Sequence, residues 1–395
     1  MLFLVTEDWY FASHRLPLAR AVRDQGVEVY VMTHLNGQRE ALEAEGFRVI
    51  PWKTVVPRST NVFREARSLW EVFRAYRRVR PDLVHHIALK PSVYGAFVAL
   101  FLRRISSVQT VAGLGYLFTN PPRKLRPLRW LLVAALRLVL RGDRSRTIFQ
   151  NPDDRDFFER VGLVRKNDSR LIRGSGVNMA KLVALPEPDG IPVVTLSARM
   201  LWDKGVGEFV EAATRLQREG VQARFVLAGR LGGPSRGSIS EKQLDEWAAA
   251  GIVEWWGFVD DIRSLMAKST IICLPSYYRE GVPKILIEAA SCGRAIVTTD
   301  SPGCRDVVRD GENGFLVPPR DALALEKTIR LLLDDSELRS RMARQGRKIA
   351  ELEFSEELVI RETMGVYNEL MGDRWPDAAP GRELARAAQA ARTSS

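Results

Sequence analysis

The sequence predicts an α/β protein of two domains, each built on a doubly wound parallel sheet. Short apolar runs alternate with helical patterns in two successive blocks, and a Pro-rich polar segment, residues 184–190, separates these blocks. The size agrees with this class, because 395 residues with 46% apolar content can bury two full cores. We therefore expect an N-terminal domain at residues 1–183 and a C-terminal domain at residues 184–354.

The first block carries six candidate strands joined by helical patterns. The strands are expected at residues 2–6, 27–33, 48–51, 83–87, 108–112 and 147–149. Helical periodicity at residues 14–25 and 68–79 falls between them, as parallel strands with crossover helices require. Residues 1–6 lack a basic lead and a long apolar core, so this run is predicted to be the first strand and not a signal peptide.

The second block repeats this alternation after the linker. Strands are expected at residues 191–196, 224–228, 253–256, 270–274 and 295–298, with helices at 205–219 and after Pro283. Three final helices are expected at residues 322–333, 336–353 and 355–371. The last of them lies in a segment, 355–374, that we expect to return to the first domain. Residues 375–395, rich in Ala and Arg, are predicted to form a flexible tail.

Composition narrows the class of protein. The cysteines Cys273, Cys292 and Cys304 show no CxxC spacing, which disfavours disulfides and a cysteine zinc site and fits a reducing compartment. The longest apolar runs, residues 93–102 and 130–133, are shorter than the roughly 20 residues that a spanning helix needs. We therefore expect a cytoplasmic protein that is soluble or peripheral to a membrane.

The positive charge is concentrated in the first part of the chain. Residues 1–180 contain 30 Lys and Arg against 16 Asp and Glu, so they carry +14 and the remainder carries −3 of the total +11. Basic and apolar residues interleave at 121–146, and a second basic stretch covers 63–80. Such helices either lie on an anionic bilayer surface or pack inward in the ordinary way. Nucleic acid is disfavoured as a partner because no recognised nucleic-acid motif accompanies the charge.

The most specific pattern is EGVPKILIE at residues 280–288. It follows the apolar run 270–275, which indicates a buried parallel strand, and Pro283 suits the first position of a helix. The N-terminus of a helix at a sheet edge binds anions. The carboxylates of Glu280 and Glu288 instead accept hydrogen bonds from hydroxyl groups. An anion combined with hydroxyls points to a nucleotide sugar as the ligand.

Two cations precede this motif on another predicted loop. Arg199 and Lys204 follow the first strand of the second domain, five positions apart. Taken alone they are ordinary surface charges. Positioned ahead of the glutamate pair, they suit a diphosphate, because a departing nucleoside diphosphate gains negative charge as the glycosidic bond breaks.

These features together resemble the retaining glycosyltransferases of family four, which have the GT-B fold of two Rossmann-like domains facing across a cleft. The resemblance covers residues 1–371 and joins four elements in order: Arg199 with Lys204, then residues 256–261 (WGFVDD), 280–288 and 311–317 (GENGFLV). Residues 82–91 and 110–118 are similar to a bacterial branch that builds surface polysaccharides and lipid-linked oligosaccharides, and residues 174–178 fit the family's interdomain segment.

The resemblance implies roles for the donor side. Arg199 and Lys204 would hold the diphosphate and Glu280 the sugar hydroxyls, all three as catalytic residues, while Glu288 would bind the ribose. The full donor set is Arg199, Lys204, Val259, Glu280, Gly281, Val282, Pro283, Lys284 and Glu288. The amides of Val282 and Lys284 can donate near the sugar and phosphate, whereas Pro283 has none. The family works without a metal, so no cofactor is expected, and Asp154-Arg155-Asp156 is predicted to be a helix start.

The acceptor side is expected in the first domain. Many family members have a His two residues beyond the first His of the motif after the fourth strand, and Ile87 occupies that position here. His86, next to that position, is expected to be catalytic, and Lys90 is the alternative that would supply the polar function instead. The remaining acceptor-side candidates are His14, His85, Lys90, Gly113 and Gly115. For each His the alternative is a satisfied structural residue.

The sequence thus predicts a retaining transferase on the inner face of the cell membrane. It would move a hexose or N-acetylhexosamine from a nucleotide sugar, UDP-linked, to a lipid-linked or polysaccharide acceptor in cell-envelope glycan synthesis. Its further partner would be the anionic inner-membrane surface. Two alternatives stay open: a UDP-sugar 2-epimerase of the same fold, and a non-catalytic basic protein that binds membranes or nucleic acid.

Overall fold

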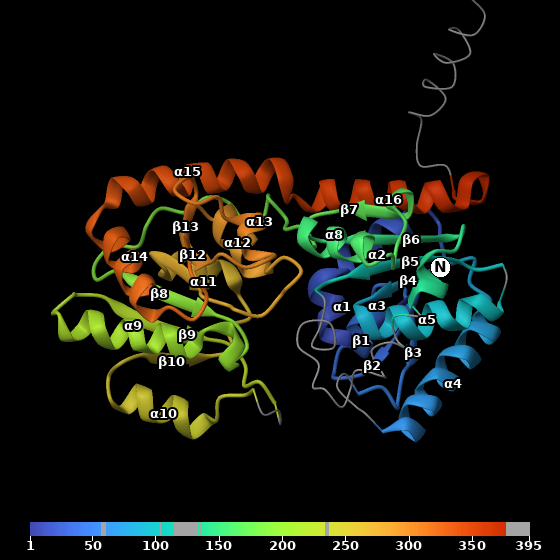
Figure 1. The fold of residues 1–395 in the computed structure, drawn as a ribbon, viewed down its shortest axis with the longest axis horizontal. Coiled ribbons are helices and arrows are strands. Elements are labelled where there is room, and N and C mark those ends of the chain that lie inside the picture. The colour runs from blue at the N-terminus through green and yellow to red at the C-terminus, as the bar shows by residue number, and fades with distance from the viewer. Residues whose placement is uncertain (57–60, 103, 114–132, 134–135, 234–236, 377–395) are drawn as a thin grey trace, which may run out of the picture. The chain divides into compact units, whose positions relative to one another are not determined.

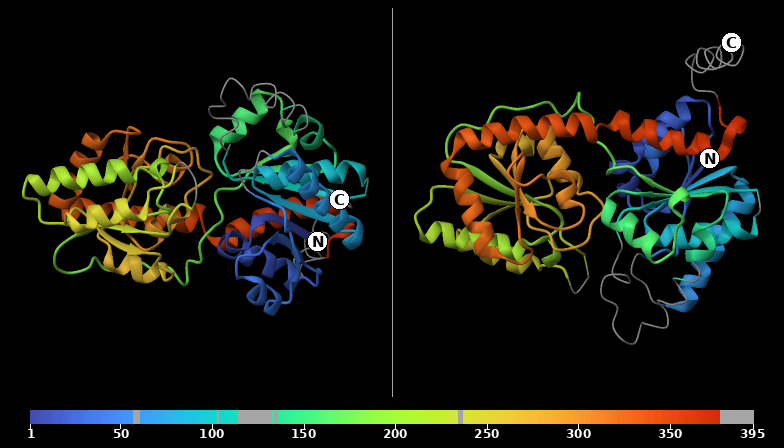
Figure 2. Two further views of the ribbon diagram at one scale, coloured as in Figure 1. Left: turned by 90° about the horizontal axis from the view of Figure 1, so that it is seen from below. Right: turned by 45° about the horizontal axis from the view of Figure 1, so that its top comes forward.

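A computed structural model describes residues 1–56, 61–102, 104–113, 133, 136–233 and 237–376. The chain divides into two compact units, and helices cover both faces of the sheet in each (Figure 1, Figure 2). Unit 1 comprises residues 1–112, residues 116–172 and the C-terminal segment from Ile360, while unit 2 comprises Gly113–Gly115 and Arg173–Val359.

Unit 1 is built on a seven-stranded parallel sheet of order β3-β2-β1-β4-β5-β6-β7. Its strands are β1 (Leu2–Glu7), β2 (Tyr30–His34), β3 (Arg48–Pro51), β4 (Leu83–Ile87), β5 (Ser106–Val111), β6 (Ser145–Phe149) and β7 (Ser169–Leu171). The six predicted strands all form, and β7 adds a short edge strand that the sequence pattern missed. The strand order reverses between β1 and β4, which is where an open sheet of this kind forms its ligand crevice.

The described helices of unit 1 fill the connections between these strands. They are α1 (Asp8–His14), α2 (Leu16–Asp24), α3 (Arg39–Ala44), α4 (Val62–Val79), α5 (Leu89–Phe101) and α8 (Pro152–Arg160). Asn61 and Asn151 cap α4 and α8, since each side-chain oxygen accepts a hydrogen bond from a first-turn N–H. The core between α4, α5 and the sheet buries Trp52 and Tyr76 completely.

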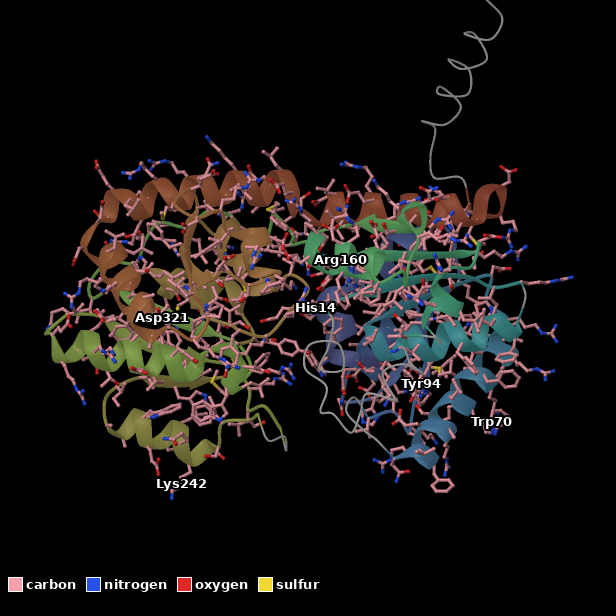
Figure 3. All side chains as sticks on the ribbon, viewed as in Figure 1. His14, Trp70, Tyr94, Arg160, Lys242 and Asp321 are labelled. Carbon is pink, nitrogen blue, oxygen red and sulfur yellow. The ribbon has the colours of Figure 1, made fainter. Side chains whose placement is uncertain are left out.

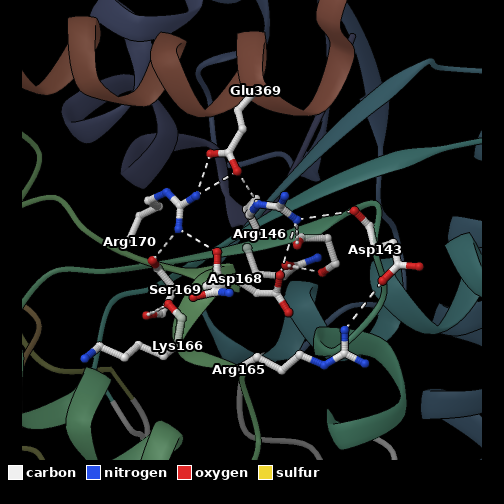
Figure 4. Close-up of polar contacts among 11 residues, drawn as sticks. Asp143, Arg146, Arg165, Lys166, Asp168, Ser169, Arg170 and Glu369 are labelled. Atoms are coloured by element: carbon white, nitrogen blue, oxygen red, sulfur yellow. Dashed lines mark hydrogen bonds and ion pairs between the residues drawn. The ribbon is translucent and has the colours of Figure 1, made fainter.

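The final helix α16 (Glu356–Met371) joins unit 1 from Ile360 onward. The Glu369 carboxylate accepts hydrogen bonds at 2.7 Å from both Arg146 on β6 and Arg170 on β7 (Figure 4). The indole N–H of Trp375 donates to the Gln25 side chain at 2.9 Å. Charged and aromatic contacts therefore tie the end of the described chain to the sheet edge and to the end of α2.

Unit 2 contains a six-stranded parallel sheet of order β10-β9-β8-β11-β12-β13. Its strands are β8 (Val193–Ser197), β9 (Arg224–Ala228), β10 (Glu254–Gly257), β11 (Ile271–Leu274), β12 (Ala295–Thr299) and β13 (Gly314–Val317). The order reverses between β8 and β11, so the loops that follow these two strands meet at the switch point.

Two layers of helices enclose this sheet. The helical elements described are η3 (Trp202–Lys204), α9 (Val206–Arg218), α10 (Glu241–Ala249), α11 (Ile262–Lys268), α12 (Lys284–Ser291), α13 (Cys304–Val307), α14 (Ala322–Asp334) and α15 (Ser336–Glu353). One core cluster packs α9 and α14 on one face through Phe209 and Leu325, and another packs α12 and α15 on the other face through Leu286 and Ile349.

The boundary between the units lies earlier than the sequence predicted. The structure divides the chain between Ile172 and Arg173, whereas the Pro-rich segment suggested a division between residues 183 and 184. The reason is that the intervening segment packs on unit 2. Val177 pairs with Ser355 as an isolated bridge, and the Leu185 N–H donates to the Cys292 carbonyl at 3.1 Å.

Candidate active site

The loops after β8 and β11 hold each other in place at the switch point of unit 2. The Asp203 carbonyl oxygen accepts hydrogen bonds from the Tyr277 N–H at 3.1 Å and from the Ser276 hydroxyl at 3.2 Å. Gly205 permits this approach, because its φ is +77° and a Cβ there would lie 2.2 Å from the Pro275 carbonyl oxygen. The two loops consequently form one rigid corner.

This corner brings together two of the predicted donor residues. Lys204 Nζ lies 2.5 Å from Glu280 Oε2, and the Ser276 hydroxyl donates to Glu280 Oε1 at 2.8 Å. The two charged side chains are only 13% and 16% exposed. An ammonium offers three donors and a carboxylate about four acceptor sites, so both groups keep capacity for a ligand. The pair therefore places a cation beside a carboxylate, which are the two kinds of group that the sequence predicts for a phosphate and for sugar hydroxyls.

Helix α12 starts next to this pair. The structure makes Pro283 the N-cap, with φ −65° and ψ 116°, and Lys284 the first helical residue, one position later than predicted. No side chain caps this N-terminus, so the positive end of the helix dipole faces the loop that precedes it. Gly303 supports that loop, because its φ is +86° and a Cβ on it would lie 2.1 Å from the Gly281 carbonyl oxygen.

Glu288 lies one helical turn further along α12. Its carboxylate is 3.6 Å from Lys284 Nζ and the residue is 9% exposed. Burial raises the pKa of the Glu288 carboxyl, and the Lys284 ammonium partly offsets that effect. A buried carboxylate of this kind is stabilised by any hydroxyl donor that reaches it.

The other predicted donor residues follow the neighbouring strands. Arg199 is exposed after β8 and makes no side-chain hydrogen bond or ion pair with the described residues. Val259 is half-buried after β10. Two residues that the sequence reasoning missed lie at this edge, since the Arg230 guanidinium stacks 3.9 Å from the ring centroid of Phe258. Phe258 lies within the motif at residues 256–261 and follows Gly257, which ends β10, whereas Arg230 comes two residues after the end of β9.

The structure corrects the role expected of His86. The residue is 0% exposed on β4, and its Nε2 is hydrogen-bonded to the Tyr76 hydroxyl at 2.8 Å. Burial lowers the pKa of His86 to about 3, so the ring is neutral at physiological pH. The side chain is enclosed in the core, and only Nε2 of its ring is hydrogen-bonded, because Nδ1 has no partner among the described residues.

His85, which points to the opposite face of β4, is also internal. Its Nδ1 is hydrogen-bonded to the Tyr367 hydroxyl at 2.6 Å and its Nε2 to Thr110 Oγ1 at 2.7 Å. Burial, and secondarily the Arg15 charge, hold the pKa of His85 well below its usual value. Arg15 was missed by the sequence reasoning. It is 3% exposed, and its Nε and Nη2 have no acceptor among the described residues.

The remaining acceptor-side candidates are distributed over other parts of the chain. Lys90 lies in the first turn of α5, where it pairs with Glu65 at 2.8 Å and donates to the Val56 carbonyl at 2.6 Å. His14 ends α1, and its ring stacks on Tyr10 with centroids 4.2 Å apart. Gly113 has a φ of +100° and Gly115 lies outside the described residues.

Metal ligands do not cluster in the described part of the chain. No group of three or more His, Cys, Asp or Glu residues lies close enough there to hold an ion. Asp154 and Asp156 belong to α8, and Asp154 is enclosed at the capped start of that helix. The three cysteines are buried and unpaired.

Comparison with known proteins places this geometry in a family. The family model described as "Glycosyl transferases group 1" matches residues 180–349, and the model described as "Glycosyl transferase 4-like" matches residues 1–151. The two matches together cover most of the chain. The chain belongs to the group 1 glycosyltransferases.

Two bacterial proteins resemble this glycosyltransferase over nearly the whole chain. It is 28% identical to the N,N'-diacetylbacillosaminyl-diphospho-undecaprenol alpha-1,3-N-acetylgalactosaminyltransferase of Campylobacter jejuni, over 90% of this chain and 95% of that one. It is 26% identical to the putative glycosyltransferase EpsD of Bacillus subtilis, over 94% and 97% of the two chains.

Solved structures confirm the fold class of this glycosyltransferase. The Anabaena protein Alr3699/HepE in complex with UDP and glucose superposes with a TM-score of 0.76 at 19% identity, over 93% of this chain and 98% of that one. WaaG, a glycosyltransferase involved in lipopolysaccharide biosynthesis, superposes with a TM-score of 0.71 at 15% identity, over 94% and 99%. Within the described residues, no helix combines the length and apolar character needed to cross a bilayer.

Proposed function

We propose that this glycosyltransferase moves a hexosyl or N-acetylhexosaminyl group from a UDP-sugar to a lipid-linked or polysaccharide acceptor, with retention of anomeric configuration. The observation that carries the donor half is the Lys204–Glu280 pair beside the uncapped start of α12. It combines a cation, a hydroxyl acceptor and a helix N-terminus within one rigid corner. A sugar diphosphate needs all three.

Donor binding exchanges the partners of this pair. A phosphate oxygen takes Lys204 as its cation, and a hydroxyl of the donor sugar donates to Glu280 in place of the ammonium. Arg199, exposed and without an ion pair to the described residues, adds a second positive charge from the same loop. Because the diphosphate gains charge as it departs, these cations bind the transition state more strongly than the ground state.

The lining of the site supports a role for Glu288 in binding the rest of the donor. Its buried carboxylate, which already has Lys284 as a partner, would accept hydrogen bonds from the ribose. Two cations and a helix end do the electrostatic work that a divalent metal does in other sugar transfers. Retention is proposed from the family resemblance, with departure and attack on the same face of the sugar.

Similarity to known proteins supports the donor and the acceptor classes. The Anabaena protein binds UDP, and the name of the Campylobacter relative states an undecaprenyl diphosphate-linked acceptor. We therefore assign this chain to cell-envelope glycan synthesis, and we propose that it works on the cytoplasmic face of the cell membrane, where both substrates meet.

Helix α4 supplies a surface suited to that location. Phe63 is 89% exposed and Trp70 is 55% exposed, and Figure 3 shows Trp70 on the outer side of the helix. The exposed basic residues of this helix and its C-cap are Arg64, Arg67, Arg74, Arg77, Arg78 and Arg80. None of the exposed residues within α4 is acidic, since Glu65 pairs with Lys90 and Glu71 is half-buried.

This surface meets the requirements for an anionic bilayer. Aromatic side chains enter the interfacial region, and each arginine near the surface contributes about 1 kcal/mol of attraction. In the other basic stretch predicted from the sequence, residues 121–146, the structure describes residues 133 and 136–146. We propose helix α4 as the membrane-facing element of unit 1.

A nucleotide-sugar screen tests the proposed reaction. The purified full-length protein is incubated with UDP-, GDP- and dTDP-sugars and with a membrane lipid extract, and the products are separated from free sugar. We expect transfer from a UDP-sugar that disappears in Glu280→Gln and persists in Glu254→Gln, a matched control whose carboxylate lies in the exposed Arg224 pair. Release of UDP with an epimerised free sugar in the absence of acceptor would instead establish the 2-epimerase reaction.

A further inference from the structure

Unit 2 contains a pocket next to the corner that Lys204 and Glu280 form. A cavity of about 490 Å³ opens between η3, the first turns of α9, the loop after β11 and the start of α14. Helices α9 and α14 pack against each other at this place, and Figure 3 labels Asp321 at the start of α14 beside α9. The proposed roles of Lys204 and Glu280 use none of the residues that line it.

Aromatic rings form two parts of the wall. Trp202 is 40% exposed, and its ring rests on the first turn of α9, where a Cβ on Gly207 would lie 2.9 Å from the indole. The edge of Trp247 meets it with ring centroids 6.0 Å apart, which fixes the indole. Tyr277, from the loop after β11, supplies the second ring. Exposed aromatic faces bind apolar C–H surfaces.

Polar groups in the pocket remain available to a ligand. Glu208 makes no hydrogen bond or ion pair with the described residues, although its charge helps burial to raise the pKa of the Tyr277 hydroxyl. The Arg320 guanidinium stacks 4.4 Å from the Tyr277 ring centroid without a hydrogen-bond acceptor in the described part of the chain. Arg320 holds this position with a φ of +63°, which is strained for a residue with a side chain.

The balance of charge selects the class of ligand. Glu211 is paired with Arg215 at 2.7 Å, and Asp321 accepts the capping hydrogen bond from the Ala324 N–H at 2.9 Å. Glu208 and Arg320 are then left without a hydrogen bond or ion pair to the described residues, and the Asp321 carboxylate adds its negative charge beside them. A phosphate is repelled by Glu208 and a cation by Arg320, whereas a hydroxyl donates to one and accepts from the other.

We propose that this pocket is a second carbohydrate site, which binds a neutral pyranose of a glycan separately from the donor sugar. The ring stacks on Trp202 while its hydroxyls bridge Glu208 and Arg320. The binding does not depend on the proposed transferase reaction.

The same pocket is linked to the donor corner through the backbone. Trp202 lies two residues before Lys204, and Tyr277 directly follows Ser276. The Asp203 carbonyl accepts hydrogen bonds from both Ser276 and Tyr277 and so joins the two segments. A sugar bound here therefore contacts the segments that position the Lys204–Glu280 pair. The structure thus predicts that glycan binding and UDP affinity influence each other, and this part rests on the proposed function.

Sugar binding to UDP-saturated protein tests the proposal. UDP occupies the donor corner, and methyl glycosides of glucose, galactose, mannose and N-acetylglucosamine are added while protein NMR signals and calorimetry report binding. We expect at least one glycoside to bind with a millimolar Kd. Glu208→Gln and Arg320→Gly should each weaken that binding by tenfold or more, and glycine at 320 also relieves the backbone strain.

The exposed Lys242→Gln variant on α10 is the control and should bind normally. Thermal unfolding and UDP titration of every variant separate this site from the donor site. Arg320→Gly should bind UDP with wild-type affinity and unfold at a temperature no lower than that of the wild type. Absence of binding by all four glycosides, or equal binding by wild type and both pocket variants, would overturn the second site while leaving the transferase proposal intact.

Discussion

The Lys204–Glu280 pair makes a quantitative prediction for Lys204→Ala. Breaking a fully buried ion pair costs roughly 3–5 kcal/mol and an exposed pair contributes about 0.2–1 kcal/mol. With the two side chains 13% and 16% exposed, we expect the free energy of unfolding to fall by roughly 2 kcal/mol, between these limits. Most of this loss comes from the Glu280 carboxylate, which loses its ammonium partner and keeps the Ser276 hydroxyl as a donor.

A double-mutant cycle isolates the contact. Urea unfolding of Lys204→Ala, Glu280→Gln and the double variant should give a coupling energy of at least about 1 kcal/mol, because the second change removes the stranded charge. Sugar transfer by Lys204→Ala should fall by roughly 10²–10³-fold, as for the loss of a group that stabilises a developing anion. Additive stabilities together with transfer above a tenth of the wild-type rate would refute both the contact and its role.

Three further predictions follow from the structure. Burial lowers the pKa of His86 to about 3, so the unfolded state takes up a proton at a higher pH than the folded state does. The contribution of His86 to stability is therefore complete above pH 6.5 and is lost as the pH falls toward 3. Urea unfolding should show that the free energy of unfolding falls between pH 7 and pH 5 by about 2 kcal/mol less in His86→Gln than in the wild type. An unchanged pH dependence would contradict the burial of His86. Gly205→Ala should displace the donor corner and weaken UDP binding at least tenfold in calorimetry, and normal UDP affinity would show that the corner tolerates a Cβ. Phe63→Ser with Trp70→Ser should reduce sedimentation with anionic vesicles, and salt should reduce it in the wild type. The matched control is Leu352→Ser, at a residue that is 76% exposed on α15, and this variant should sediment with vesicles as the wild type does. An equal loss of sedimentation in both variants would contradict the proposal that α4 contacts the membrane.

The donor corner was predictable because its signals are local and periodic. Glu280 follows a continuous apolar strand and precedes a helix start, and Lys204 follows the strand that opens the second block. Parallel strands on either side of a switch point place such loops together without any further information. The one-residue error at Pro283 arose because proline fits both the N-cap and the first helical position.

The first unit was harder to predict for a physical reason. Both faces of β4 are buried, so the alternation of side chains does not show which His faces a crevice, and both His85 and His86 prove to be internal. The return of the C-terminal segment was expected, but the contacts that hold α16, such as Glu369 with Arg146 and Arg170, were not, because they join residues far apart in sequence. Long-range charge pairs leave no periodic signal.

The anomeric configuration of the transferred sugar tests the central claim most directly. The protein is given an α-linked UDP-sugar and a polyprenyl diphosphate-linked saccharide, and the purified product is examined by proton NMR at the new anomeric centre. We expect an α-linked sugar on the acceptor, formed by wild type and not by Glu280→Gln. A β-linked product would contradict retention, and the same α-linked product from Glu280→Gln at the wild-type rate would contradict the donor site.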